Sequence, residues 1–422
     1  MEWSDIMATV VLVGTLDTKG AEYNYVKQCI KEAGVDVIVV DTGILGEPPF
    51  KPEISASMVV EAAGKDINEI RFAKEGSDTR AYAIETMGRG LEKVLERLLN
   101  EGKCDAVFGM GGSGGTNLIS SAMKTLPLGV PKLMLSTMMS GDVRPYVGCT
   151  DMTMMYSVTD IAGLNMISRM ILANAAHAVA GMALFHEAAI VKARGDKKPL
   201  IAITMFGITT PGVLHMIDLL EDRGFETIIF HATGSGGEAM ESMIREGLID
   251  GVIDYTLAEL CDYEFGGVFS AGPNRLTAAT DMGIPQVVVP GAIEVLNYNG
   301  VAHLPADKNI PERKLIIHNP TVCAVKATNE ELNILGRIVG EKVSRAKDKV
   351  EVLLPLGGLD KYEQKGGPWE DKESDKVLFD AIKNSLRKDI PVQEIDANIN
   401  DPIFAEAAVE TFIKLWKKED VK

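Results

Sequence analysis

The sequence predicts an α/β protein made of two doubly wound, mostly parallel-sheet, Rossmann-like subdomains with a cleft between them. Three observations favour this fold class. Apolar, β-branched runs alternate with helical segments along the whole chain, which is typical of parallel sheets covered by helices. The 422 residues exceed what one hydrophobic core normally organises. A charged, proline-terminated stretch at residues 192–199 interrupts the alternation. We therefore expect subdomains at residues 1–195 and 196–422.

The composition restricts the partners and the compartment. A formal net charge of -17 argues against nucleic acids and anionic membrane surfaces, because both are themselves negatively charged. The sequence has no run of about 20 apolar residues of the kind that spans a membrane. The 5 cysteines are scattered without a Cys-x-x-Cys pair, which is typical of core residues in a reducing compartment. We therefore expect a cytoplasmic protein that binds a small molecule.

The first candidate site is the loop inside an opening βαβ unit. Residues 9–15 form the first strand, a helix follows as far as Ala33, and residues 35–40 form the second strand. Such strands are parallel, and parallel sheets bind ligands at the carboxyl ends of their strands. The candidate cofactor-binding residues at this end are Gly14, Thr15, Asp17, Thr18 and Lys19. Lys19 could neutralise a phosphate, and Asp17 could hold a ribose hydroxyl or Mg²⁺. The alternative is a surface loop that only caps the helix.

A glycine-rich loop after the third strand is the second candidate site. It has five glycines between Gly109 and Gly115, and it joins the strand at residues 105–107 to a helix at residues 118–123. Backbone N–H groups and a helix N-terminus together bind anions, and glycine lets a ligand approach closely. The candidate anion-binding residues are Gly111, Gly112, Ser113, Gly114, Gly115 and Thr116. The spacing matches neither a Walker loop nor the dinucleotide-binding fingerprint. It indicates a phosphate or carboxylate site, and a ligand-free turn is the alternative.

The rest of the first half adds two expectations. The fourth strand, at residues 131–137, is followed by Ser140, Gly141 and Asp142. Ser140 and Gly141 are candidate cofactor-binding residues, and Asp142 is a candidate magnesium ligand through water or a catalytic residue. A long, largely apolar helix is expected from Ile161 to about Glu187. Its small residues allow close packing against a second copy, so we expect a homodimer.

The second half repeats the opening plan. Strands at residues 200–204 and 226–231 enclose a helix, and this βαβ unit is as long as the first. A second glycine loop follows it, with the candidate cofactor-binding residues Gly234, Ser235, Gly236 and Gly237. These residues repeat the Gly-Ser-Gly-Gly order of residues 112–115. One glycine loop in each half predicts a ligand in the cleft between the subdomains.

Two histidines are the candidate acid–base catalysts. His231 ends the strand before the second glycine loop, and His318 follows a later strand at residues 315–317. Imidazole suits proton transfer near neutral pH. For His231 the alternative is an exposed turn residue. Arg275 is a candidate anion clamp, and we expect the polar tract 360–374 to be mobile.

Several strings in the chain together resemble one family. They are Gly14–Gly20, Gly111–Asn117, Ser140–Val143, Met154–Asn165, His231–Gly237, Ser270–Pro273 and His318–Thr321. In this order, and over nearly the whole chain, they look like the Tm-one-like ATP-binding domain family. The resemblance implies two α/β subdomains, a nucleotide site that holds ATP with Mg²⁺, and dimerisation. It does not imply a particular reaction.

The sequence leaves three functions open. The first is a nucleotide-binding protein or ATP-dependent enzyme that holds phosphates on the loop at residues 111–116. The second is a metabolic enzyme for a small phosphorylated or carboxylated substrate without ATP, with His231 or His318 as the acid–base catalyst. The third is a non-catalytic protein in which ATP changes a surface that a partner recognises. An enzyme should lose turnover when His231 is changed, whereas a binding protein should keep its nucleotide affinity and form no product.

Overall fold

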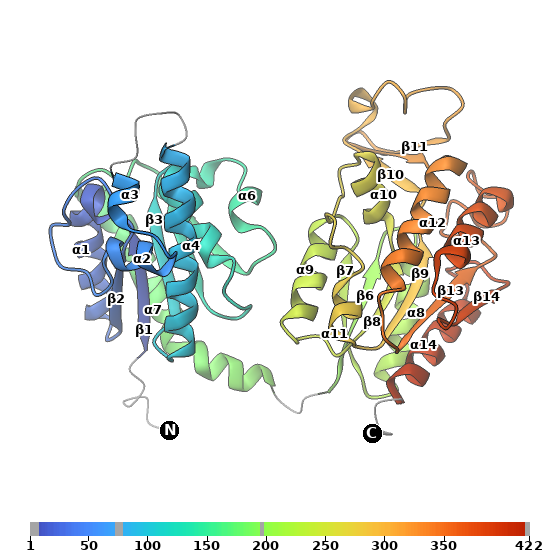
Figure 1. Cartoon of the computed structure of the whole chain (residues 1–422), viewed down its shortest axis with the longest axis horizontal. Helices are drawn as coiled ribbons and strands as arrows, with labels where there is room; N and C mark the ends of the chain where they lie inside the picture. The colour runs from blue at the N-terminus through green and yellow to red at the C-terminus, as the bar shows by residue number, and fades with distance from the viewer. Residues whose placement is uncertain (1–7, 72–78, 195–197, 418–422) are drawn as a thin grey trace. The chain divides into compact units, whose positions relative to one another are not determined.

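The computed structural model describes residues 8–71, 79–194 and 198–417, and the side chains at 79–80, 188–189 and 191–194 lie outside this description. The chain divides into two compact units, residues 1–196 and 197–422 (Figure 1). Each unit is a parallel sheet with helices on both faces, which confirms the predicted α/β class and two-part architecture. The predicted boundary falls within residues 195–197, outside the described residues. The expected cleft between the units stays a prediction.

The N-terminal unit is built on a five-stranded parallel sheet in the order β2-β1-β3-β4-β5. Its strands are β1 (Thr9–Gly14), β2 (Asp36–Asp41), β3 (Ala106–Gly111), β4 (Lys132–Ser136) and β5 (Met152–Tyr156). Its helices are α1 (Leu16–Glu32), α2 (Ala56–Ala62), α3 (Ile67–Arg71), α4 (Thr79–Asn100), α5 (Ser113–Met123), η1 (Thr137–Ser140), α6 (Arg144–Val147) and α7 (Met166–Arg194). The strand order reverses between β1 and β3, so the connections from these two strands run to opposite sides.

Alternate residues of β1 serve two hydrophobic cores. Val10 and Leu12 pack with α1 and α7, whereas Val11 and Val13 pack with α2, α4 and α5. Successive side chains of a strand point to opposite faces, so both faces of this sheet need an apolar cover. The run of apolar residues without polar alternation is therefore the sequence signature of a strand buried on both sides.

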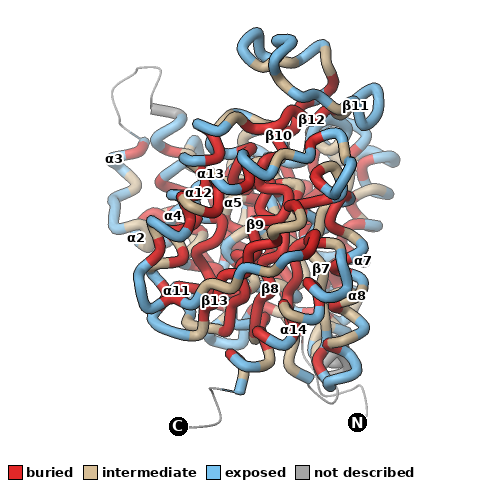
Figure 2. Tube along the Cα trace, turned by 90° about the vertical axis from the view of Figure 1, so that its right-hand side faces the viewer, coloured by how far each residue is buried: buried red, intermediate tan, exposed pale blue. Residues whose placement is uncertain are grey.

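The C-terminal unit has a six-stranded parallel sheet in the order β14-β13-β9-β8-β6-β7. Its strands are β6 (Leu200–Met205), β7 (Glu226–His231), β8 (Gly251–Thr256), β9 (Gln286–Gly291), β13 (Val350–Pro355) and β14 (Val392–Ile395). Its helices are α8 (Thr210–Glu221), α9 (Ser235–Arg245), α10 (Ala258–Phe265), α11 (Ala278–Met282), η2 (Val301–His303), α12 (Asn329–Val343), α13 (Lys372–Ser385) and α14 (Pro402–Trp416). Figure 2 shows β8, β9 and β13 as buried strands. This sheet is wound in the same order as the first one.

A small antiparallel sheet is added to the C-terminal unit, and only its strand at residues 315–317 was predicted. It has the order β10-β12-β11, with β10 (Val295–Tyr298), β11 (Leu315–Asn319) and β12 (Val322–Lys326). The structure also adds the edge strand β5 in the N-terminal unit, for which the methionine-rich sequence predicted no strand. The tract 360–374 buries Trp369, which is only 1% exposed. This tract is therefore packed onto the unit, in contrast to the mobile segment that its polar composition predicted.

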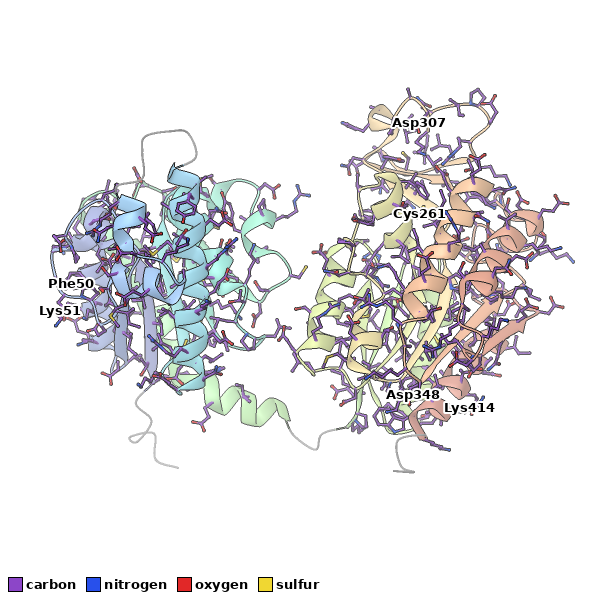
Figure 3. All side chains as sticks on the ribbon, viewed as in Figure 1. Phe50, Lys51, Cys261, Asp307, Asp348 and Lys414 are labelled. Atoms are coloured by element: carbon purple, nitrogen blue, oxygen red, sulfur yellow. The ribbon has the colours of Figure 1, made fainter. Side chains whose placement is uncertain are left out.

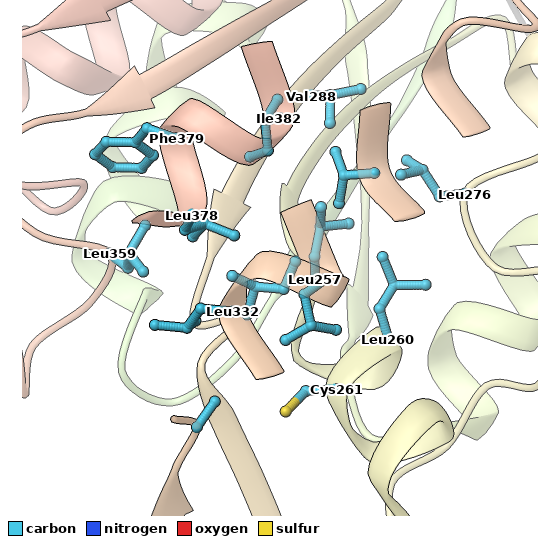
Figure 4. Close-up of a cluster of buried hydrophobic side chains, with 14 of the residues drawn as sticks. Leu257, Leu260, Cys261, Leu276, Val288, Leu332, Leu359, Leu378, Phe379 and Ile382 are labelled. Carbon is cyan, nitrogen blue, oxygen red and sulfur yellow. The ribbon is translucent and has the colours of Figure 1, made fainter. Parts of the chain in front are cut away.

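Helices α12 and α13 enclose the largest core of the C-terminal unit. Figure 4 shows part of it, including Leu257, Leu332 and Leu378, with Cys261 of α10 at its margin. Cys261, which is also labelled in Figure 3, is fully buried. The other buried cysteines are Cys29, Cys104 and Cys323, and Cys149 is partly exposed. Burial of four of the five cysteines agrees with their expected place in the cores.

Helix α7 begins five residues later than its apolar pattern suggests. Asn165 caps it, because its side-chain oxygen accepts two backbone N–H groups of the first turn at 3.0 Å. Among the described residues, α7 is the one helix long and apolar enough to cross a membrane, over residues 166–187, and 39% of an 18-residue window within it is buried. Its buried face, which includes Ala175, Ala176 and Val179, packs on α1 and on β1, β3 and β4.

Candidate functional site

A pocket of about 690 Å³ lies at the carboxyl edge of the N-terminal sheet. Its walls come from the loops after β1, β2 and β3, from the start of α5, and from α3 and α4. Seven sequence-predicted residues line it: Thr15, Asp17, Thr18, Gly112, Ser113, Gly114 and Gly115. The pocket sits beside the point between β1 and β3 where the strand order reverses. Doubly wound α/β sheets hold their ligands at this point.

The glycine loop presents the start of α5 to the pocket. Helix α5 begins at Ser113, and its N-cap residue, Gly112, has no side chain that could accept its first N–H groups. A β-carbon at Gly112 or Gly115 would meet no described protein atom closer than 3.8 Å. The fold therefore has room for a larger residue at both positions. Packing does not require glycine at these positions, whereas the close approach of a ligand to the backbone would.

Two buried oxygen atoms in the pocket walls have no hydrogen-bond partner among the described residues. They are Oδ1 of Asp17 and Oγ1 of Thr42. The other carboxylate oxygen of Asp17 accepts the backbone N–H of Leu45 at 2.7 Å, so the side chain is held in place. Buried polar atoms in proteins nearly always have a partner, and each exception calls for an explanation. Both oxygens are therefore candidates for a contact with a ligand.

Arg71 brings a positive charge to the pocket, and sequence reasoning did not select it. It ends α3 and lines the pocket, and its Nε donates to the carbonyl oxygen of Ile44 at 3.2 Å. That hydrogen bond fixes the stem of the guanidinium group. The motif-based search missed Arg71 because it lies far from both glycine-containing loops in the sequence. No motif in the residues around it marks a binding site.

Several predicted site residues do not line the pocket. The Lys19 ammonium donates to the backbone oxygen of Ile161, and Lys19 has a non-helical backbone conformation within α1. Asp142 makes a two-point ion pair with Arg144, at 2.9 Å to Nε and 2.8 Å to Nη2. These hydrogen bonds lower the pKa of Asp142 to about 2. Ser140 and Gly141 follow β4 at the end of η1, also outside the lining residues.

Three other predicted residues have structural tasks. A β-carbon at Gly14 would lie only 1.7 Å from the Tyr23 hydroxyl oxygen, which donates to the backbone of β1 and β3. At Gly111 a β-carbon would lie 3.3 Å from Cα of Gly115, so glycine allows α5 to pack closely on β3. The Thr116 hydroxyl is buried and bonds to the backbone oxygen of Gly112 and to Ser136. These residues shape the site without facing a ligand.

The second glycine loop, at the start of α9, already holds an anion that belongs to the chain. The N–H groups of Gly234 and Gly237 donate to Oε1 of Glu259, at 2.7 and 3.0 Å. A β-carbon at Gly237 would come within 2.2 Å of the same carboxylate, and one at Gly236 would lie 2.0 Å from the backbone oxygen of His231. Ser235 is the first residue of α9. The helix start thus receives its negative charge from Glu259 of α10.

Arg275 belongs to the same buried network. Its guanidinium group is fully buried and bonds to Glu259 at 2.7 Å, to Asp254 at 2.5 and 2.8 Å, and to Glu241 at 3.5 Å. The three carboxylates hold the pKa of Arg275 above its usual range in spite of burial. Arg275, the candidate to bind an external anion, therefore binds three carboxylates of the chain itself.

The two candidate catalytic histidines lie in the C-terminal unit, on different sheets. His231 is exposed at the end of β7, and its ring centre lies 5.6 Å from that of Phe206. Partial burial lowers the pKa of His231. His318 is exposed on β11 of the small antiparallel sheet. Neither histidine lines the pocket of the N-terminal unit.

The fold and the pocket define a two-unit α/β protein with a pocket at the switch point of its first sheet. The chain belongs to the uncharacterised protein family UPF0261. Residues 8–188 match the N-terminal domain of that family, and residues 198–416 match its C-terminal domain.

Relatives of the chain occur in bacteria and in a plant. A UPF0261 protein of Clostridium tetani is 43% identical over 410 residues, which cover 97% of this chain and 99% of that protein. A UPF0261 protein of Rhizobium meliloti is 38% identical over 412 residues, or 96% and 98% of the two chains. The ToMV resistance protein Tm-1(GCR237) of Solanum lycopersicum is 33% identical over 429 residues, covering 97% of this chain and 56% of the tomato protein. These relatives confirm the family resemblance that the motifs indicate.

Proposed function

We propose that this protein binds a nucleoside triphosphate, ATP with Mg²⁺, in the pocket of its N-terminal unit. The observation that carries the proposal is the pair of unpartnered buried oxygens, on Asp17 and Thr42, in the same pocket as the open start of α5. A ligand with phosphates, hydroxyl groups and a bound cation offers partners to all of these groups. The volume of about 690 Å³ also suits a ligand of this size, since small-molecule pockets measure roughly 300–1,000 Å³.

The phosphates would lie on the backbone N–H groups at the start of α5. A helix N-terminus carries a partial positive charge, and its first N–H groups have no acceptor within the helix. Arg71 adds a full charge and a planar donor group, the kind that pairs well with phosphate oxygens. In this proposal Arg71 neutralises the phosphate charge, because the Lys19 ammonium is bonded to Ile161.

The magnesium ion would be held by Asp17, by phosphate oxygens and by water. Among the described residues no group of three or more His, Cys, Asp or Glu side chains could hold a metal ion. Mg²⁺ fits such a site, because it keeps several waters and commonly takes one or two carboxylates together with substrate phosphates. Oδ1 of Asp17, a residue of the pocket lining, is the carboxylate oxygen without a hydrogen-bond partner among the described residues. Asp142 is left out because Arg144 occupies both of its oxygens.

A small phosphorylated or carboxylated metabolite is the alternative ligand, since it would use the same N–H groups. The test is calorimetric titration of the protein with ATP, with and without Mg²⁺, for wild type, Gly114→Asp and Gly114→Asn. Gly114 is the second residue of α5. The new carboxylate should repel the phosphates and weaken ATP binding by about tenfold or more beyond the effect of the isosteric amide. No ATP binding by the wild type, or equal binding by the two variants, would contradict the proposal.

A further inference from the structure

We propose that the pocket recognises the phosphates and ribose of its nucleotide and accepts different bases. This inference rests on the proposed function and concerns the part of the pocket that its polar groups do not cover. That part is an apolar wall formed by Ile44, Leu45, Ile70, Ile84, Met87 and Leu118. None of these side chains can donate or accept a hydrogen bond, apart from the weak acceptor sulfur of Met87.

The backbone of the loop after β2 adds little to base reading, because two of its polar groups are already engaged. The N–H of Leu45 donates to Asp17 at 2.7 Å, and the carbonyl oxygen of Ile44 accepts from Nε of Arg71 at 3.2 Å. These two backbone groups are thus engaged in holding Asp17 and Arg71 in place. Both residues belong to the proposed phosphate and magnesium end of the site.

The chemistry of discrimination explains the expected tolerance. Bases differ mainly in the donors and acceptors on their edges, and a site that bonds to those groups rejects the wrong partner by large factors. An apolar surface binds a base by excluding water, and its affinity discriminates only weakly between ligands of similar size. A base on this wall is therefore held by burial, and adenine and guanine are held almost equally.

Leu45 offers a variant that should leave the fold intact. Its side chain is 84% exposed, so its replacement removes apolar pocket surface without opening a core. Met58 of α2 is a matched control, because it is 44% exposed in the same unit and does not line the pocket. The probes are ATP, GTP and inorganic triphosphate, each titrated calorimetrically in the presence of Mg²⁺.

We expect ATP and GTP to bind within about tenfold of each other. Leu45→Ser should lower the affinity for both nucleotides by roughly threefold to tenfold. It should leave the affinity for inorganic triphosphate unchanged, because triphosphate has no base that could contact Leu45. Met58→Ser should leave all three affinities unchanged.

The outcomes separate the two proposals. If neither nucleotide nor triphosphate binds the wild type, the proposed function fails. If ATP binds and GTP binds more than about a hundredfold more weakly, the proposed function stands and base tolerance is overturned. Base placement on the apolar wall is also overturned if Leu45→Ser lowers the affinity for triphosphate as much as that for ATP.

Discussion

Asp17 combines a structural and a proposed ligand-binding role in one side chain. One carboxylate oxygen fixes the loop after β2 through the N–H of Leu45, and the other is buried and has no hydrogen-bond partner among the described residues. Asp17→Asn keeps an oxygen for Leu45 and removes the charge that would attract a cation. We expect this variant to lose roughly tenfold of its affinity for ATP in the presence of Mg²⁺, and little without Mg²⁺.

The measurement is a pair of calorimetric titrations, with Mg²⁺ and with a chelator. Asp142→Asn is the control, since Asp142 is paired with Arg144 outside the pocket, and it should titrate like the wild type. An unchanged magnesium dependence in Asp17→Asn would show that the cation is held elsewhere.

Glu259 is the residue on which the second glycine loop depends. Its removal would deprive the N–H groups of Gly234 and Gly237 of their acceptor and leave Arg275 buried with one carboxylate fewer. We expect Glu259→Ala to lower the free energy of unfolding by about 3–5 kcal/mol in urea denaturation. Glu226→Ala, at an exposed position on β7, should change it by less than about 0.5 kcal/mol. A similar small effect at Glu259 would mean that the network does not stabilise the unit.

For single residues, the sequence predicts which loops form an open helix start better than it predicts the bonding partner of each side chain. Glycines after a strand mark an open helix start, and Gly112–Gly115 do line the pocket. The same pattern at Gly234–Gly237 holds Glu259, and the sequence gives no sign that an acid from a later helix returns to this loop. Lys19 is likewise the visible cation of its motif, whereas Arg71 reaches the pocket from a separate helix. Tertiary packing decides these assignments.

Among the elements, the strap of residues 359–371 is held by a buried acidic cluster in the C-terminal unit. The cluster contains Glu294, Asp360, Glu363, Asp375 and Lys326, and Lys326 pairs with Glu363 at 2.5 Å. Burial, followed by the charge of Glu363, raises the pKa of Asp360 to about 7 and that of Asp375 to about 8. Burial also raises the pKa of Glu294. At neutral pH part of the cluster is therefore protonated.

The raised pKa values predict a loss of stability with rising pH. An unfolded aspartate has a pKa of about 3.9, so between about pH 4 and pH 8 the folded state binds more protons than the unfolded state. The contribution is complete below pH 4 and declines until the pH passes 8. We expect the free energy of unfolding in urea to fall by on the order of 1–3 kcal/mol from pH 6 to pH 9.

Asp375→Asn should flatten that decline, because it removes one of the titrating groups. Asp380→Asn, on the same helix, alters a half-exposed residue that pairs with Lys383, and it should keep the wild-type pH profile. Equal profiles for Asp375→Asn and wild type would place the pH dependence outside this cluster.

The elements themselves were predictable where a single local rule applies. Apolar runs such as residues 9–15 form buried strands, and glycines such as Gly34 follow the ends of helices. The edge strand β5 escaped prediction because its polar and methionine residues are only partly buried. The polar tract at 360–374 was expected to be mobile because the sequence does not show that Lys326 bonds to Glu363 and to the backbone of Trp369 within it.

On the scale of the whole molecule, two sheets of the same winding order differ in how they use a helix start. The N-terminal unit leaves α5 open beside a pocket, whereas the C-terminal unit closes α9 with Glu259. The two glycine loops are also not equivalent in topology, since one follows the third strand of its sheet and the other follows the second. Under the proposed function, ligand binding belongs to the first unit and does not require the second glycine loop.

We also propose that the protein is a homodimer that uses the exposed start of α7. Met166 is 75% exposed and Met170 is 61% exposed, beside the half-exposed Ile167. Covering these side chains in a dimer would remove apolar surface from water. Static light scattering at micromolar concentration should give twice the chain mass for wild type, and the single-chain mass for Met166→Lys with Met170→Lys. Met58→Lys, on α2, should remain dimeric, and a monomeric wild type would contradict the proposal.

The most direct test of the central claim is a crystal structure of the protein with a non-hydrolysable ATP analogue and Mn²⁺ in place of Mg²⁺. Phosphate density should appear on the N–H groups of residues 113–115, with Arg71 beside it, and an anomalous manganese peak should appear at the Asp17 carboxylate. The base should lie on the apolar wall near Leu45. A nucleotide bound on the loop at residues 234–237, with the pocket of the N-terminal unit empty, would contradict it.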